Sequence, residues 1–437
     1  MFSLIKNAFL VKDIRSRLAY TFMILIVFRL GTYITVPGVN AAEIQTFASS
    51  GLFGILNTFS GGALTNYSIF AMGVSPYITA SIVVQLLQMD IVPTFVEWSK
   101  QGEVGRRKLN QVTRYLTIVI GVVQALGISL GFNALANYGL IKNPNMNTYM
   151  MIALVLTAGT MFVTWLGDMI TVNGIGNGVS IIIFAGIVSR IPAGVYTFFM
   201  QTFHDASGNL LEGTELYRAM AFSAALVVAI VLVIIMVVYV EQAQRRLPIH
   251  YSKRATGASN TSRLPLKINS AGVIPVIFAS SFMTTVSTVL GFLSAEHKDS
   301  GWYQTLTNIF DLQGLVGASL FTFLIIVFTY FYAFVQINPE KVAENLQKQG
   351  GYILSVRPGK ETEQYISTML VRLSTVGAFY LGLISILPML ATALWRLPRE
   401  LMLGGTSLLI VVGVALEIGR QIEGRMVKRK YQGFIEN

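Results

Sequence analysis

Cysteine is absent from this sequence of 437 residues, histidine occurs three times, and only 12% of the residues are charged. Without cysteine the chain can form no disulfide, no thiolate metal site and no cysteine nucleophile. The three histidines, at positions 204, 250 and 297, are too far apart in the sequence to suggest a histidine-ligated metal site. Soluble domains carry about 25% charged residues, so a fraction this low excludes the polar shell of a water-soluble protein.

Hydrophobic residues make up 53% of the chain, and the mean hydropathy is +0.61. This balance indicates a polytopic membrane protein. A helix needs about 20 apolar residues to cross the hydrocarbon of a bilayer. A window of that length finds ten spans, at residues 18–37, 69–89, 113–133, 150–170, 178–199, 217–240, 271–293, 313–336, 367–390 and 401–418.

The basic residues predict the orientation of these spans. With the N-terminus in the cytoplasm, 25 of the 32 Lys and Arg residues fall on the cytoplasmic side and six on the other, while Arg29 lies within the first span. Cytoplasmic loops of membrane proteins carry the excess of Lys and Arg. An even number of spans then places both termini in the cytoplasm.

A repeat links the second and seventh spans. GVSPYITAS at 73–81 recurs as GVIPVIFAS at 272–280, with six of nine positions identical, and the repeat pairs Ile78 with Ile277. Internal repeats in membrane proteins often present equivalent helices to a common axis. We therefore expect two structural halves. The alternative is chance similarity, because apolar spans are built from few residue types.

The segment 51–68 is too short and too rich in glycine to span the membrane, yet it is apolar. Such backbone lies at membrane depth only where protein or a water-filled cavity surrounds it. The pattern favours a re-entrant segment, with a surface turn as the alternative. Arg29, within the first span, carries a charge that is costly there; we expect it to have a structural partner, with a mechanistic role as the alternative.

Two loops, 241–270 and 338–366, are longer than a simple connection needs. The first has basic ends and a polar tip, which predicts a solvated, mobile loop. In the second, Asn338, Pro339 and Gly350 mark the start and end of a short helix. Arg357 precedes a proline, which favours an extended backbone, and its distance from either span suggests contact with a partner.

The sequence also lacks the motifs of an energised or catalytic protein. It has no Walker motif, HExxH or GxSxG. GIGNG at 174–178 has no preceding strand and no following Lys-Ser/Thr, so it predicts a tight turn. The acidic residues lie almost entirely in loops or at span ends, whereas ion-coupled transporters place them inside the membrane. A passive conduit with an apolar, dewetting constriction is the favoured interpretation.

Several stretches of the sequence resemble those of a known family. FAMGVSPYITASIVVQLL (70–87) and WLGDMITVNGIGNGVSIII (165–183) are similar to the two signature segments of the SecY family, the central subunits of bacterial protein-conducting channels. The resemblance extends from the first span to the last. It implies an all-α fold of ten transmembrane helices in two pseudo-symmetric five-helix halves, arranged as a clamshell.

The resemblance also implies sites, which are expectations here. The pore ring comprises Val74, Ile78, Val179, Ile183, Ile277 and Ile410. The plug, at residues 57–68, includes Asn57, Phe59, Gly61, Gly62 and Leu64. The lateral gate lies between the second and seventh spans, with Gln85, Gln88, Thr284 and Thr285 as polar candidates. The docking positions for the motor ATPase SecA and the ribosome are Arg245, Arg246, Lys253, Arg254 and Arg357.

The sequence thus predicts a channel of the bacterial cytoplasmic membrane that passes unfolded secretory polypeptides outward and releases apolar segments into the bilayer. Its expected parts are an N-terminal half (1–200), a C-terminal half (201–419) and a basic tail (420–437). SecE, SecG, SecA, the ribosome, the signal-bearing polypeptide and the lipid bilayer are the implied partners. No catalytic residue, cofactor or metal is expected. The alternatives are a secondary transporter of an amphipathic solute and, less favoured, an intramembrane enzyme.

Overall fold

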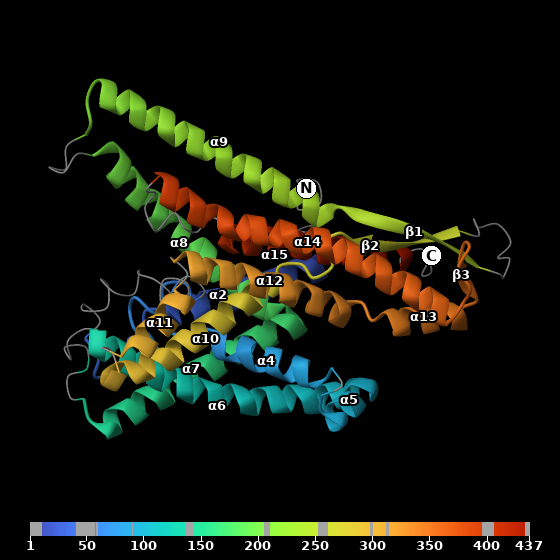
Figure 1. The fold of residues 1–437 in the computed structure, drawn as a ribbon, viewed down its shortest axis with the longest axis horizontal. Helices are drawn as coiled ribbons and strands as arrows, with labels where there is room; N and C mark the ends of the chain where they lie inside the picture. Colours follow the sequence, from blue (N-terminus) through green and yellow to red (C-terminus); the bar gives the residue numbers. More distant parts are fainter. Residues whose placement is uncertain are drawn as a thin grey trace.

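The computed structural model describes residues 11–40, 57, 60–89, 91–135, 141, 144–204, 210–251, 261–297, 300–311, 314–395 and 406–432. Ten helices in these ranges correspond to the ten predicted spans. They are α2 (Lys12–Gly31), α4 (Ser75–Leu87), α6 (Glu103–Leu135), α7 (Met146–Asn173), α8 (Gly178–Phe203), α9 (Thr214–Gln242), α10 (Ile274–His297), α12 (Leu315–Gln336), α14 (Lys360–Trp395) and α15 (Thr406–Gln432). Three shorter helices are α5 (Pro93–Lys100), α11 (Gly301–Phe310) and α13 (Pro339–Lys348). The long helices run roughly side by side as a bundle (Figure 1).

Within the described part of the chain, six helices are long and apolar enough to cross a membrane on their own composition: α6, α7, α8, α9, α12 and α14. The helix α4 and the stretch Ile274–Leu290 of α10 are apolar but shorter. The helices α2 and α15 are long enough, but one end of each carries several charged residues. The tenth predicted span continues well beyond residue 418, because α15 runs on to Gln432, into the segment expected as a basic tail.

Two span predictions differ from the structure in their limits. The first span was expected at 18–37, but α2 ends at Gly31, so Arg29 lies in its last turn and not deep inside a helix. The second was expected at 69–89, but the helix starts only at Ser75. Residues 60–74 form turns, because left-handed backbone at Gly61, Gly62 and Gly73 interrupts any helix there.

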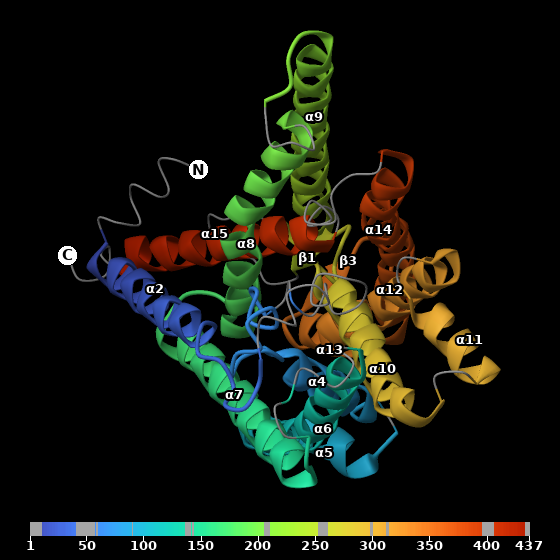
Figure 2. The same ribbon diagram turned by 90° about the vertical axis from the view of Figure 1, so that its left-hand side faces the viewer.

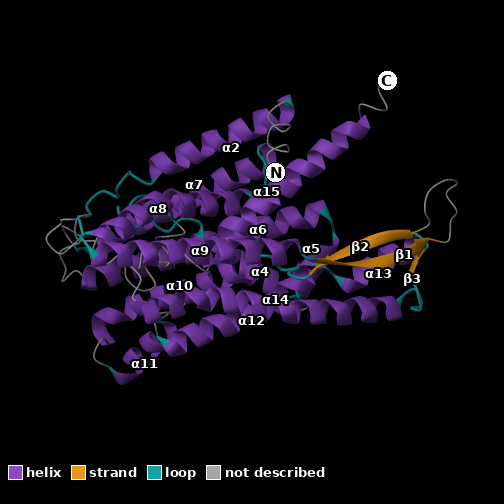
Figure 3. Ribbon diagram, turned by 90° about the horizontal axis from the view of Figure 1, so that it is seen from above, coloured by secondary structure: helices purple, strands orange, loops and turns teal. Residues whose placement is uncertain are grey.

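A small antiparallel sheet was not expected. Residues of the first long loop form strands β1 (Gln244–Tyr251) and β2 (Thr261–Lys267), and β3 (Gly351–Ile353) from the second loop pairs with the other edge of β1. The strand order is β2-β1-β3. Figure 3 shows the sheet with α13 at one end of the bundle, which we call the hairpin end. The prediction of a solvated, mobile loop was therefore wrong for residues 244–251 and 261–267.

The sheet forms because one of its faces is apolar. Leu247 and Ile249 alternate along β1 and are buried, and Leu266 from β2 is buried with them. They pack against α13 and α14 in two small apolar clusters. Alternation with a period of two is the mark of a half-buried strand, but basic residues and prolines between the apolar positions obscured it. The short helix of the second loop was predicted correctly: α13 begins after Asn338, whose side chain accepts a hydrogen bond from the Lys341 amide at 3.1 Å.

Candidate functional site

The predicted repeat adopts the same local structure in both copies. Gly73 and Gly272 both have left-handed backbone, with φ of 54° and 63°, immediately before α4 and α10. One turn on, the Ile78 amide donates to the Val74 carbonyl at 3.0 Å, and the Ile277 amide donates to the Val273 carbonyl at 3.3 Å. Ile78 and Ile277 therefore occupy equivalent first-turn positions on two helices.

All six expected ring residues gather in one apolar cluster. Val179 packs against the cluster, and the other five are buried members of it: Val74, Ile78, Ile183, Ile277 and Ile410. The six residues together join α4, α8, α10 and α15. Figure 2 looks along the bundle and shows these four helices around its middle. The stretches that carry the ring, 74–87, 178–189, 273–291 and 406–416, contain no Asp, Glu, Lys, Arg or His.

The described part of the expected plug is buried beside this cluster. Asn57 and Leu64 are almost fully inaccessible, at 1% and 0% exposure, and Ala63 belongs to the same apolar cluster as the ring. A Cβ placed on Gly61 would lie 2.9 Å from the Cα of Gly186, so the segment rests directly on the backbone of α8. The burial rules out the surface turn for these residues. Phe59 lies outside the described residues.

The internal hydrogen bonds of the plug centre on Asn57. Its Nδ2 donates to Thr65 Oγ1 at 2.7 Å, and its Oδ1 accepts from the Thr65 amide at 3.1 Å. Its carbonyl accepts from the Gly62 amide at 2.8 Å. The end of the segment pairs with the stretch that follows α2, through an antiparallel bridge between Thr35 and Ser68. A short chain with two adjacent left-handed glycines thus keeps a compact shape beside the apolar cluster.

Across the boundary between α4 and α10, one of the four gate candidates makes the polar contact. Thr285 Oγ1 accepts a hydrogen bond from Gln124 Nε2 of α6 at 2.6 Å and lies 3.1 Å from Thr79 Oγ1 of α4. Thr285 Oγ1 also donates to the Ser281 carbonyl at 2.7 Å. The hydroxyl therefore joins three helices.

The other gate candidates do not reach across. Thr284 donates to carbonyls of its own helix, and Gln85 donates to Ser81 of its own helix at 3.0 Å. Gln88 is half-buried. Sequence reasoning missed Gln124, which lies on α6 and not on either of the two helices expected to form the gate. A Cβ on Gly127, one turn further along α6, would lie 2.5 Å from the Thr288 carbonyl, so α6 and α10 approach closely here. The sequence alone does not reveal this approach, because it depends on how the two helices are placed.

The expected docking residues that the structure describes lie at the hairpin end and are exposed. Arg245 and Arg246 are on β1, and Arg357 is in the turn between β3 and α14. The Arg357 carbonyl accepts from Thr362 Oγ1 at 2.8 Å, which fixes this turn to the first turn of α14. Lys253 and Arg254 lie outside the described residues.

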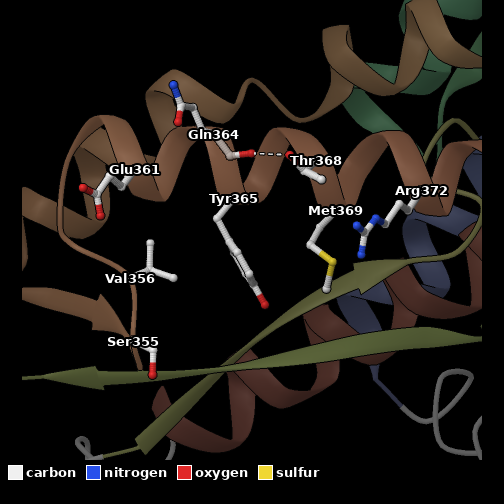
Figure 4. A pocket seen from close by; sticks show the side chains of 8 residues that line it. All are labelled: Ser355, Val356, Glu361, Gln364, Tyr365, Thr368, Met369 and Arg372. Carbon is white, nitrogen blue, oxygen red and sulfur yellow. Dashed lines mark hydrogen bonds between the residues drawn. The ribbon is translucent and has the colours of Figure 1, made fainter.

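A cavity of about 360 Å³ opens beside this turn. Figure 4 shows Tyr365, Met369 and Arg372 along α14, with Ser355 and Val356 from the preceding turn on the other side. The lining mixes apolar and charged side chains. The cavity lies between α14 and the sheet, next to the turn that precedes α14.

Comparison with known proteins decides the family. The SecY family model matches residues 68–419. The chain belongs to the SecY family. Two similar relatives are a protein translocase subunit SecY of Lactobacillus kefiranofaciens subsp. kefiranofaciens, 56% identical, and one of Bacillus subtilis (strain 168), 52% identical. Each alignment covers 100% of both chains.

Solved structures share the SecY fold at low sequence identity. One described as a protein-conducting channel has a TM-score of 0.68 at 18% identity and covers 94% of this chain and 93% of its own. Sec61 in a canine ribosome–channel complex has a TM-score of 0.65 at 17% identity and covers 94% and 93%. The ten-helix clamshell expected from the sequence is therefore confirmed, and the protein is a component of the cytoplasmic membrane.

Proposed function

We propose that this protein is the channel subunit of a protein translocase and that its cluster of apolar residues from α4, α8, α10 and α15 is the constriction of the pore. The observation that carries the proposal is this cluster itself. It contains all six expected ring residues, with Ile78 and Ile277 at equivalent positions in the two halves, and the stretches that carry these six hold no charged side chain. The cluster continues into α2, α7, α9, α12 and α14.

The constriction works through the properties of branched aliphatic side chains. A narrow passage lined only by them excludes water and with it ions. It offers no fixed hydrogen bonds, so a passing polypeptide of any sequence meets no specific partner that must be satisfied. The helices that carry the ring separate around the chain and close again behind it. The plug segment beneath, packed on Gly186, adds a second barrier in the resting state.

Lateral release needs a seam between helices that opens. The seam we propose runs between α4 and α10, with α6 beside it, and its polar contact is the set Thr79, Gln124 and Thr285. Hydrogen bonds between membrane helices contribute about 0.6 kcal/mol on average and up to about 1.7. Contacts of that size hold the seam closed but yield to an apolar segment that partitions into lipid by its own transfer free energy.

Gln124→Leu removes the hydrogen-bond donor and keeps the side-chain size, so we expect the seam to open more readily. A loss of about 1 kcal/mol shifts the opening equilibrium about fivefold. Translocation of a substrate with a shortened, weakly apolar signal should rise in a reconstituted assay. Gln85→Leu is the matched control, because Gln85 bonds to Ser81 within α4. Equal effects of the two variants would contradict a specific role for Gln124.

The orientation and partners complete the proposal. On the distribution of basic residues we assign the hairpin end and both termini to the cytoplasm. The exposed Arg245, Arg246 and Arg357 then face either rRNA phosphates or the acidic surface of a motor. We assign SecA and the ribosome to this end, and SecE and SecG to the membrane-facing helices. In keeping with this assignment, α9 is very apolar and only 6% of its most apolar stretch is buried. The two halves divide near residue 200.

The decisive experiment is crosslinking, which the absence of cysteine makes simple. Single cysteines at Ile78, Ile183 and Ile277 should each crosslink to a stalled secretory polypeptide. A cysteine at Ala229, on the apolar and largely exposed α9, should not. Solute uptake driven by an ion gradient, with no crosslinks at the ring, would instead support the secondary transporter.

A further inference from the structure

Arg29 places a guanidinium group against the plug. It lies in the last turn of α2 and is half-buried, and its Nη1 donates a hydrogen bond to the Gly61 carbonyl at 2.7 Å. Its Nη2 donates to the Tyr33 hydroxyl at 2.9 Å, and its guanidinium carbon lies 4.9 Å from the centre of the Tyr33 ring. None of the three ion pairs among the described residues includes Arg29. Its positive charge is therefore directed at a backbone carbonyl and not at a carboxylate.

The shape of the plug presents that carbonyl to α2. Gly61 and Gly62 both have left-handed backbone, with φ of 68° and 87°, which reverses the chain sharply. The same Gly61 faces Gly186 of α8, at a separation that leaves no room for a side chain. Gly61 is thus held from two sides, by a hydrogen bond from α2 and by contact with α8.

The position on α8 connects this contact to the constriction. Gly186 follows the ring residue Ile183 by three positions, so the two lie on the same face of the helix, about one turn apart. The close contact between Gly61 and Gly186 therefore places the plug directly beside the ring. If the hydrogen bond from Arg29 is lost, Gly61 keeps only its contact with α8.

We propose that Arg29 is a positioning residue that holds the plug against α8 beside the ring in the resting channel, an inference that rests on the channel function proposed above. Arginine suits this role because a charge-assisted hydrogen bond is stronger than a neutral one, and more so where water is scarce. Its location in the last turn of α2 also fits, since carbonyls at a helix C-terminus favour a cation. The bond is a single one, so the plug can leave when a polypeptide enters.

The test uses the full-length chain in its purified membrane complex, reconstituted in liposomes. Ser60, 1% exposed and inside the plug, is replaced by cysteine as the only thiol of the chain. Arg29→Gln in this background should speed labelling by a membrane-impermeant maleimide about tenfold, as expected for losing a hydrogen bond to a charged group. Arg29→Lys, which keeps the charge and one donor, should restore part of the protection. Resting ion conductance should rise with the labelling rate.

Ser374→Cys in α14 is the matched control, because Ser374 is equally buried but lies in the other half. Unchanged labelling at Ser60 in Arg29→Gln would overturn the inference. So would equal acceleration at Ser60 and Ser374, which indicates a general loosening of the protein. A serine variant of the ring that leaks, beside an Arg29→Gln variant that does not, refutes this inference alone. If neither leaks, the proposed constriction itself is refuted.

Discussion

Replacing Ile78, Ile183 and Ile277 together by serine is expected to make the resting channel conduct ions while leaving membrane insertion intact. The three side chains come from α4, α8 and α10 and lie in one apolar cluster. Serine removes the branched aliphatic surface and adds hydroxyls that bind water. Water therefore enters the constriction, and ions can pass through it. We expect resting conductance in planar bilayers to rise about tenfold or more.

A control separates this effect from simple loosening of the core. Ile152 and Leu156 are also fully buried, but they lie in a second cluster formed by α6, α7 and the end of the plug region. Serine at these two positions should destabilise the protein without opening an ion path, since large-to-small core changes cost about 2–5 kcal/mol wherever they occur. Equal conductance in both variants, or none in the ring variant, would count against this assignment of the constriction.

Arg357→Glu is expected to weaken motor- or ribosome-dependent export while the channel stays folded and sealed. Arg357 is exposed in the turn before α14, and its structural contacts are made by its backbone: the amide donates to Glu361 and the carbonyl accepts from Thr362. Reversing the side-chain charge therefore leaves the turn intact but repels an acidic partner. A loss of about 1.4 kcal/mol at the docking contact lowers export about tenfold.

Export by proteoliposomes at limiting motor concentration measures this change, and resting conductance verifies the seal. Lys341→Glu is the matched control, because it makes the same change of charge at an exposed position of α13 at the hairpin end. Normal export kinetics in Arg357→Glu, or an equal defect in Lys341→Glu, would refute a specific docking role.

Local sequence patterns were sufficient where a single element decides the structure. The ten apolar windows correspond to ten helices, and the start of α13 follows from the capping side chain of Asn338. The turn at 174–178 was also predicted correctly: Asn177 caps α8, and the glycines allow Gly178 to approach the Gly167 carbonyl closely. Each of these features depends on residues within a few positions of one another.

Predictions failed where a distant segment competes with the local pattern. The first long loop reads as polar, but β3 and α14, about a hundred residues later, give Leu247 and Ile249 a surface to cover. Gln85 and Thr284 were expected at the gate, yet they bond to their own helices, and Gln124, which was not expected there, makes the contact with Thr285. Which polar side chain forms a hydrogen bond across the boundary between two helices depends on how the whole helices are rotated and how closely they approach. A short stretch of sequence does not contain this information.

The sequence by itself determined that the chain is a membrane protein of ten spans, that two of its helices repeat one another, and that the stretches proposed to line the pore are uncharged, because hydropathy and residue identity fix these properties locally. Only the tertiary structure decided that Gln124 reaches Thr285 and that the guanidinium of Arg29 points at Gly61. Both contacts join segments that the chain separates, and their geometry comes from the packing of helix backbones at glycines. A sequence pattern records which groups are available for such contacts, whereas packing selects the ones that meet.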